Sequence, residues 1–225
     1  KSVKSLILAI PSARTNERQE ILKKLSRYPL EVKSLPNLAD IENDLVTLEQ
    51  IKFVEVDDIL GREIVLPKKE LLRKNISNKN ILITGAGGSI GAELSRQIKD
   101  LQPSKIILLD NSEYNLYNIH NELTITNGVE VIPVLSTVTN YKQIYDVIKK
   151  HTIHTIYHAA AYKHVPMVEL NVVSGVYNNV IGTFNVATAA KELKVENMVL
   201  ISTDKAVRPT NVMGASKRLS EFILQ

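Results

Sequence analysis

The segment from Asn80 to Asp110 constrains the fold of this chain more than any other, because it joins two apolar runs through a cluster of glycines: NILITGAGGSIGAELSRQIKDLQPSKIILLD. The first run ends at Thr84, and the second run, from Lys105 to Leu109, ends next to Asp110. Between them, apolar residues recur at the spacing of one helix face, at Ile90, Leu94, Ile98 and Leu101. The segment therefore predicts a strand, a tight turn, an amphipathic helix and a second strand.

The glycines and the final aspartate have the spacing of a dinucleotide-binding turn. Gly85, Gly88 and Gly91 follow the form Gly-x-x-Gly-x-x-Gly, which the chain fits at least as well as Gly-x-Gly-x-x-Gly. The first two glycines allow a tight turn close to a pyrophosphate, and Gly91 lets the helix pack closely on the strand. The N–H groups at the helix start face the anion. Asp110, 19 residues after Gly91, is placed to bind an adenosine ribose. The alternative is a glycine-rich turn that binds no ligand.

After Asp110, predicted strands and helices alternate without a break. The pattern gives a helix capped by Ser112, a strand at 129–135, a helix at 141–150, a strand at 155–159, a helix at about 172–193, a strand at 198–202 and a last helix from about 211. The strands lack polar alternation, which is typical of a parallel sheet covered on both faces. We therefore expect an α/β fold with a doubly wound parallel sheet, the Rossmann arrangement.

The first 50 residues form a separate pattern of a strand at 5–10, a helix at 16–28 and a strand at 31–35. One β-α-β unit has no sheet of its own to complete, and the chain opens at Lys1, so we interpret residues 1–50 as the tail of a partial α/β domain whose beginning is missing. The alternative is an N-terminal extension packed on the main domain. Residues 51–79 are expected to form a connector with a helical turn at 70–74, in which Asp57 and Asp58 belong to a turn or a helix cap.

Composition argues against several classes of function. The net charge of +4 is spread over 28 basic and 24 acidic residues, with 5% aromatics and no basic block, so we expect no nucleic-acid partner. The chain has no cysteine, which excludes disulfides, thiolate catalysis and cysteine-bound zinc. His158 and His164 lack partners at ligand spacing, so we expect no metal and assign both to packing or hydrogen bonding. No apolar run approaches the roughly 20 residues of a membrane span, and we expect a cytoplasmic protein.

Two segments at strand ends carry the reactive side chains, because ligands of open parallel sheets lie beyond the carboxyl ends of the strands. The first is HAAAYKHVPMVE at 158–169, where Ala159, Ala160 and Ala161 are small enough for a cofactor ribose to pass. The second is STDKAVRPTNVMGASK at 202–217, where a hydroxyl, a carboxylate and an amine are adjacent.

Four motifs together resemble the nucleotide-sugar 4,6-dehydratases of the polysaccharide-biosynthesis branch of the extended short-chain dehydrogenase/reductases: TGAGGSIG, AAAYKHVPMVE, NNVIGTFNV and STDKAVRPTNVMGASK. The segments LILAIPSARTNERQEILKKL and VEVDDILGREIV are similar to the large, membrane-anchored form that acts on UDP-N-acetylglucosamine. This resemblance implies that residues 1–50 end a CoA-binding-like domain and that 80–225 are an NAD-binding Rossmann domain, truncated before its sugar-binding part. It also implies a longer native protein, anchored at the cytoplasmic face of the inner membrane, and it leaves a homo-oligomer open.

The resemblance implies NAD-dependent dehydration of a UDP-sugar to a 4-keto-6-deoxy sugar. Hydride passes from C4 to the cofactor, water is lost across C5 and C6, and hydride returns to C6. Thr203 would bind near the C4 hydroxyl, Asp204 would protonate the departing C6 hydroxyl, and Lys205 would remove the C5 proton. A lysine beside an acid in a closed cleft can have a lowered pKa. The alternative for Asp204 is an ion pair on the surface with Lys205 or another charge.

The main departure from short-chain dehydrogenases is Met213, which stands where a tyrosine usually precedes Lys217 by four residues. A thioether transfers no proton, so the acceptor of the C4 hydroxyl proton stays unassigned, while Lys217 would hold the nicotinamide ribose. A smaller departure is Ser136-Thr137-Val138, where relatives often have an aspartate. The remaining contacts that we expect are with the cofactor, at Gly85, Gly88, Ser89, Ile90, Gly91, Asp110, Ser112, Ala159 and Ala160, and with the sugar, at Lys163 and Asn179.

Two other functions stay open. A UDP-sugar 4-epimerase uses the same fold and the C4 redox step but needs no acid–base pair for C5 and C6, so Asp204 and Lys205 argue against it. A nucleotide-binding module without turnover is the alternative from another class.

Overall fold

The computed structural model describes residues 69–125 and 128–225, together with residues 5–8, 10, 17, 20, 21, 24, 25, 31–34 and 52–53. The chain divides into two compact units, residues 1–66 and residues 67–225, which are treated separately below.

In the first unit, strands β1 (Ser5–Leu8) and β2 (Glu31–Ser34) pair in parallel, from Ser5 opposite Glu31 to Leu8 opposite Ser34. The described residues between them, 17, 20, 21, 24 and 25, are helical, so the predicted β-α-β unit is confirmed for the part that the structure describes. Strand β3 (Lys52–Phe53) pairs antiparallel with β2. Asp57, Asp58 and most of the predicted connector lie outside the described residues. Membership of a larger domain stays a prediction.

The second unit contains a five-stranded parallel sheet in the order β6-β5-β4-β7-β8. Its strands are β4 (Asn80–Thr84), β5 (Lys105–Asp110), β6 (Glu130–Leu135), β7 (Thr155–His158) and β8 (Asn197–Leu200). Its helices are α4 (Lys69–Ile76), α5 (Ser89–Asp100), α6 (Glu113–Thr124), α7 (Tyr141–His151), α8 (Val165–Leu170), α9 (Val172–Val176), the π-helix η2 (Tyr177–Ile181), α10 (Gly182–Glu192), the 3₁₀ turn η3 (Asp204–Ala206) and α11 (Val212–Ile223). The predicted doubly wound sheet is confirmed.

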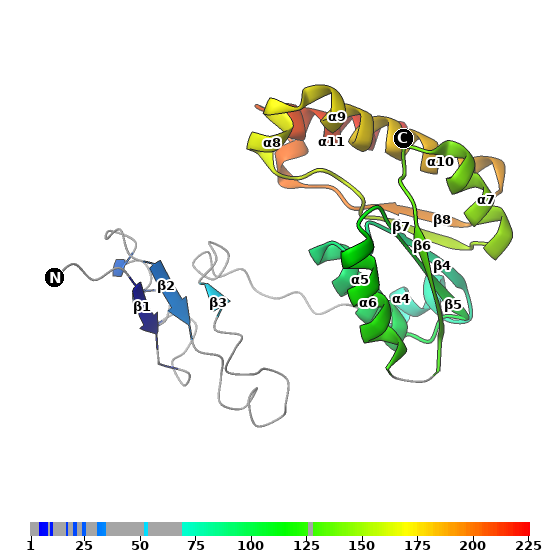
Figure 1. Cartoon of the computed structure of the whole chain (residues 1–225), viewed down its shortest axis with the longest axis horizontal. Helices are drawn as coiled ribbons and strands as arrows, with labels where there is room; N and C mark the ends of the chain where they lie inside the picture. The colour runs from blue at the N-terminus through cyan, green and yellow to red at the C-terminus, as the bar shows by residue number, and fades with distance from the viewer. Residues whose placement is uncertain are drawn as a thin grey trace. The chain divides into compact units, whose positions relative to one another are not determined.

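Helices cover both faces of this sheet, because the central strands are apolar on both sides (Figure 1). Leu82, Ile107 and Ile156 pack with α7 and α10 on one face, while their neighbours Ile81 and Ile106 pack with α4, α5 and α6 on the other. The strand order reverses at β4, which lies between β5 and β7. Ligands of such sheets bind at this reversal, outside the carboxyl ends of the strands.

Two features differ from the sequence-based expectation. The edge strands β6 and β8 are partly exposed rather than buried, and β6 contains Pro133, a residue that edge strands tolerate because it donates no ladder hydrogen bond. The helix predicted at 172–193 consists of α9, the π-helix η2 and α10. Single π-turns inside helices are rare and are often found at functional sites. Among the helices that the structure describes, none has the length and apolar character needed to cross a membrane.

Candidate functional site

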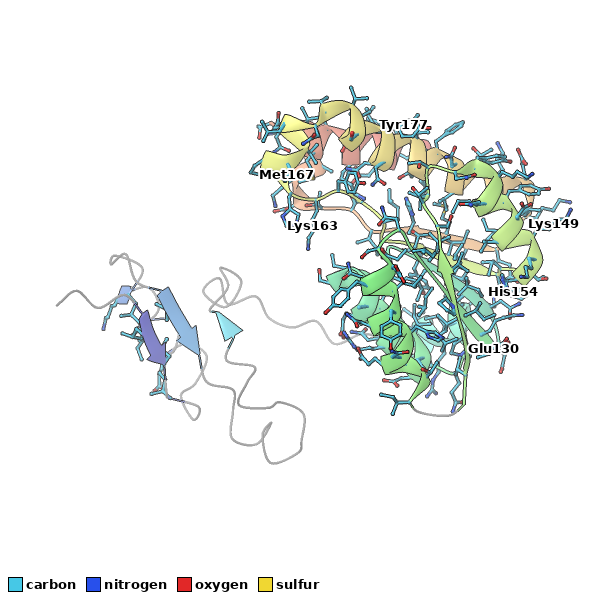
Figure 2. All side chains as sticks on the ribbon, viewed as in Figure 1. Glu130, Lys149, His154, Lys163, Met167 and Tyr177 are labelled. Atoms are coloured by element: carbon cyan, nitrogen blue, oxygen red, sulfur yellow. The ribbon has the colours of Figure 1, made fainter. Side chains whose placement is uncertain are left out.

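Three pockets meet at the carboxyl ends of the strands in the second unit. We call them the central pocket, of about 480 Å³, the Asp110 pocket, of about 180 Å³, and the Lys217 pocket, of about 240 Å³. Ala159, Ala161 and Tyr162, from the loop after β7, line all three. Figure 2 labels Lys163 on this loop and Met167 on α8, both of which line the central pocket. The two strand-end segments that the sequence singled out therefore lie around one composite site.

The glycine turn after β4 forms one wall of the central pocket. Gly85 has φ +68°, and a Cβ there would lie 2.6 Å from the backbone nitrogen of Ala160. A Cβ on Gly91 would lie 2.0 Å from the carbonyl oxygen of Gly85, so only glycine fits the contact between helix α5 and the turn. Helix α5 begins at Ser89 without a side-chain cap, and its first turn lines the pocket. Backbone N–H groups at such a helix start suit a pyrophosphate.

Asp110, the last residue of β5, is hydrogen-bonded to the same glycine turn. Its side chain is buried, and its Oδ2 accepts a hydrogen bond from the Gly87 N–H at 2.8 Å while Oδ1 accepts one from the Ser112 N–H at 2.8 Å. Ser112 is the N-cap of α6, as predicted, and accepts from the Asn115 N–H. A carboxylate has about four lone-pair sites, so Asp110 can still accept from a ribose hydroxyl. Asp110 and Ser112 both line the Asp110 pocket.

Helix α11 presents Met213 and Lys217, four residues apart, to the Lys217 pocket. Both side chains are buried, and the Lys217 Nζ donates to the carbonyl oxygen of Ile201 at 2.6 Å. Burial lowers the pKa of Lys217 to about 8. Thr203 and Lys205 line the same pocket. Lys217 thus lies within reach of a ligand while its ammonium is held at the end of β8.

Asp204 lies outside the three pockets, and the closed cleft expected around it is not present in the structure. The side chains of Asp204 and Lys205 are 80% and 52% exposed and form an ion pair with 3.6 Å between Oδ1 and Nζ. The Thr203 hydroxyl donates to Asp204 Oδ1 at 3.0 Å. This hydrogen bond, followed by the charge of Lys205, lowers the pKa of Asp204. The surface ion pair considered from the sequence is therefore what the structure contains.

Lys163 and Asn179, both predicted to contact the sugar, have different positions. The Lys163 Nζ donates to the Ser89 hydroxyl at 3.1 Å and lines the central and Lys217 pockets. Asn179 lines none of the three pockets and is 1% exposed. Its Oδ1 accepts from the Tyr162 and Asn178 nitrogens, and its Nδ2 donates to the Tyr162 carbonyl and the Ser216 hydroxyl. These bonds use the full capacity of its amide, so Asn179 holds the pocket wall rather than facing a ligand.

Sequence reasoning missed Tyr162 and Asn178 as pocket residues. Tyr162 stands in the quoted motif AAAYKHV, directly after the alanines, and that position was a usable signal. Asn178 lines the Asp110 pocket from the π-helix η2, although it lies 40 or more residues away in sequence from the pocket walls at 109–115 and 136–138. Nothing in the local sequence indicates a π-turn.

The predicted packing role of His158 is confirmed. The Thr183 hydroxyl donates to the Asn179 carbonyl at 2.6 Å, so it accepts from His158 Nε2 at 3.0 Å, and His158 Nδ1 then accepts from the Thr84 hydroxyl at 2.6 Å. The imidazole is fully buried, and burial lowers its pKa to about 3. Among the residues that the structure describes, no cluster of three or more histidines, cysteines or acids could hold a metal.

Comparison with known proteins now decides the family. A family profile described as "Polysaccharide biosynthesis protein" matches residues 81–225. The chain belongs to this family. The membership agrees with the resemblance found in the sequence, and the matched range begins inside β4 and covers all three pockets.

Relatives of this family member carry two kinds of name. The capsular polysaccharide biosynthesis protein CapD of Staphylococcus aureus is 44% identical over 225 residues, which are 99% of this chain and 38% of CapD. A UDP-glucose 4-epimerase of Rickettsia rickettsii is 37% identical over 150 residues, 64% of this chain and 42% of that protein. The chain therefore spans about two fifths of the length of these relatives.

A solved structure supports the fold of the second unit. The Bordetella bronchiseptica enzyme WbmG, in complex with NAD, has a TM-score of 0.56 and 23% identity over 66% of this chain and 49% of its own. At this identity the likeness concerns the fold alone.

Proposed function

We propose that this chain is part of an NAD-dependent dehydratase that converts UDP-N-acetylglucosamine to a 4-keto-6-deoxy sugar for polysaccharide synthesis. The observation that carries the proposal is the Lys217 pocket, which Thr203, Lys205 and Lys217 line together. Ala159 and Ala161 line this pocket and also the central pocket, which the glycine turn lines. A reactive hydroxyl and amine are thus placed next to a dinucleotide-type turn.

The residues present fit NAD. Gly85 and Gly91 leave a turn too close-packed for any side chain, the start of α5 suits a pyrophosphate, and Asp110 suits the adenosine ribose. Lys217, which lines the same pocket as Ala159, would bind the nicotinamide ribose. When bound, NAD would accept a hydride from C4 of the sugar and return it at C6, so that it is regenerated in each turnover. WbmG, a protein of this fold, is described as a complex with NAD, which supports the choice of cofactor.

The side chains after β8 would carry the proton transfers. The Thr203 hydroxyl, now bound to Asp204, would turn to the C4 oxygen of the sugar. Because that hydrogen bond is the main cause of the lowered pKa of Asp204, its loss would raise the pKa towards the ordinary value of an aspartate. Asp204 could then donate a proton to the departing C6 oxygen, while Lys205 takes the proton from C5, which is acidic when C4 is a ketone.

The test compares two lengths of the protein. A version extended to the length of the relatives should convert UDP-N-acetylglucosamine to a 4-keto-6-deoxy product, observed by mass spectrometry as the loss of one water. The 225-residue chain should have little or no activity, because catalysis needs the sugar held within roughly 3 to 3.5 Å of the nicotinamide and the chain spans only about two fifths of the length of its relatives. Robust turnover of UDP-N-acetylglucosamine by the 225-residue chain would contradict the claim that the extended protein is needed for catalysis. An extended protein that binds NAD but turns over no UDP-sugar would favour a binding module.

The second candidate is a UDP-sugar 4-epimerase, which the 37% identity to the Rickettsia enzyme favours. The two functions differ at C5. A dehydratase exchanges the C5 hydrogen with solvent, whereas an epimerase inverts C4 and leaves C5 intact. Incubation in deuterium oxide, with deuterium located by NMR in the recovered sugar, therefore separates them.

We also propose that the native protein forms a homo-oligomer and is anchored at the cytoplasmic face of the inner membrane. Apolar side chains are exposed on successive turns of the helix formed by α9, η2 and α10, at Val173, Tyr177, Ile181 and Phe184, which supports contact with a second copy. Sedimentation of the chain should give a dimer or larger species, and Val173→Glu with Phe184→Glu should give a monomer. Membrane fractionation of the extended protein tests the anchoring, and recovery in the aqueous fraction would refute it.

A further inference from the structure

Helix α11 holds the loop that follows β8 as well as lining the Lys217 pocket. Lys217 binds the carbonyl of Ile201 at the start of this loop, and the Ser202 hydroxyl donates to Glu221 Oε1 at 2.5 Å. At the other end, the Asn211 side chain caps the helix by accepting from the Gly214 N–H at 2.8 Å. The loop is thus attached to α11 at its first two residues and at its last.

The loop also lies directly against the backbone of α11 at Gly214, in the first turn of the helix. A Cβ at this position would lie 2.2 Å from the Lys205 carbonyl oxygen, 3.1 Å from the Lys205 carbonyl carbon and 3.2 Å from Pro209 Cβ. Backbone atoms at 2.2 Å cannot be accommodated by a change of rotamer, so any side chain at 214 would displace the turn η3. Glycine in a helix is less favourable than alanine, and here it allows this contact.

We propose that Gly214 is a positioning residue, whose missing side chain sets the place of the Thr203–Asp204–Lys205 turn relative to Lys217; the catalytic part of this inference rests on the proposed dehydratase function. Gly214 contacts no substrate itself. It acts through Lys205, whose backbone rests on the helix and whose side chain lines the Lys217 pocket. The turn carries the proposed acid and base, and so the proton transfers depend on this contact.

The effect of a side chain at 214 is confined to the loop. The three nearest atoms to the added Cβ all belong to residues 205 and 209. The residues that fit NAD lie instead on the turn after β4, the end of β5, the loop after β7, and Lys217 on the next turn of α11. Gly214→Ala should therefore move the acid–base turn by about 1 Å, since carbon–oxygen contacts are normally longer than 3 Å, and should leave the cofactor walls in place.

The first experiment uses the 225-residue chain and does not depend on activity. Gly214→Ala should change the NMR signals of Thr203 to Lys205 and bring the pKa of Asp204 back towards its ordinary value, because the Thr203 hydrogen bond is disturbed. NAD affinity, measured by calorimetry, should stay within about twofold of the parent chain. Ala215→Gly is the matched control: it weakens the same helix and adds no atom near the loop. Unchanged signals at 203–205, or a Gly214→Ala chain that fails to fold, would overturn the proposal.

The second experiment uses the extended protein. Displacement of a reacting group by about 1 Å typically costs 10²-fold, so Gly214→Ala should slow solvent exchange at C5 by roughly that factor while the KM for the sugar changes little. Ala215→Gly should leave C5 exchange near the parent rate. Equal losses in both variants would mean that helix stability, not the contact at 214, controls the turn. If the extended parent shows no dehydration at all, the proposed function fails, whereas the NMR result still decides whether Gly214 positions the turn.

Discussion

Two aspartates at strand ends show how differently the two sides of the site are built. Asp110, after β5, is buried and accepts hydrogen bonds from two backbone N–H groups of the glycine turn and the start of α6. Asp204, after β8, has a side chain that is 80% exposed and held only by its neighbours Thr203 and Lys205. The Asp110 carboxylate is therefore fixed by buried backbone hydrogen bonds, whereas the Asp204 carboxylate lies on an exposed surface turn.

The difference indicates what each side needs in order to function. The proposed cofactor side, around Asp110 and the glycine turn, is already ordered by contacts within the chain, so we expect it to bind NAD without further help. The proposed catalytic side is the turn of Thr203, Asp204 and Lys205, which lies next to the Lys217 pocket but is exposed. We therefore expect this side to depend on the substrate and on further parts of the protein to exclude water. Exposed charges interact weakly in water and strongly when water is removed, which is why enclosure matters for acid–base chemistry.

The largest expected effect concerns the open side. In the extended protein, Asp204→Asn and Lys205→Met should each slow elimination by roughly 10² to 10⁴-fold, the usual loss for one general acid or base. C4 oxidation should continue, so reduced cofactor should accumulate and be seen by absorbance. Met213→Ala should be much milder, because a thioether transfers no proton. Normal deuterium entry at C5 in the Lys205 variant would exclude Lys205 as the base.

A change on the closed side should weaken cofactor binding without any substrate present. Gly91→Ala places a Cβ 2.0 Å from the Gly85 carbonyl oxygen and must open the turn. Overpacking of this kind costs about 1–3 kcal/mol, equivalent to roughly 5- to 150-fold weaker NAD binding in calorimetry. Ala92→Gly, which only removes an atom from the same helix, is the control. Equal affinities for Gly91→Ala and the parent chain would show that the turn does not hold the cofactor.

The cofactor should be NAD rather than NADP. Asp110 lines its pocket as a carboxylate, Glu113 follows on α6, and both would repel a 2′-phosphate. We expect roughly tenfold or greater preference for NAD by titration calorimetry. Glu113→Gln leaves the hydrogen bonds of Asp110 to Gly87 and Ser112 intact and should reduce the preference for NAD over NADP. If the parent chain bound NADP more tightly than NAD, this prediction would be wrong.

The smallest effect is a pH dependence at the boundary between the two sides. Burial lowers the pKa of Lys217 from 10.5 to about 8, so its charge is lost as the pH rises through 8. If the ammonium donates to the nicotinamide ribose, NAD affinity should fall a few-fold between pH 7 and 9.5. Lys217→Gln should remove this dependence, and Lys163→Gln should keep it. A flat profile in the parent chain would argue against a ribose contact by Lys217.

The sequence located the glycine turn and Asp110 well because their signals are local. The strand, glycine turn, helix and acid lie within residues 80–110, and all ten predicted cofactor residues line one of the three pockets. The catalytic side was predicted less well, because exposure depends on distant chain. Thr203 and Lys205 reach a pocket, but the open position of Asp204 has no local signature.

Asn179 shows the same limit. Its partners Tyr162 and Ser216 are 17 and 37 residues away in sequence, and it lies buried in the π-helix. A motif places such an asparagine near the site, but only the three-dimensional arrangement shows that its amide is fully bonded within the protein.

The buried imidazole of His158 links the strand before the glycine turn to acid sensitivity. Its pKa of about 3, against 6.5 when unfolded, means that its contribution to stability is present above pH 6.5 and is lost as the pH falls towards 3, by up to about 1.4 kcal/mol for each pH unit. Hydrogen exchange of β4 and β7 at pH 7 and pH 5 would measure this, and equal protection would contradict it. Once Nδ1 carries a proton it can no longer accept from the Thr84 hydroxyl, so acid would remove the present hydrogen bond between β4 and β7 at the strand end before the cofactor turn, and we expect unfolding and cofactor release to share this protonation step.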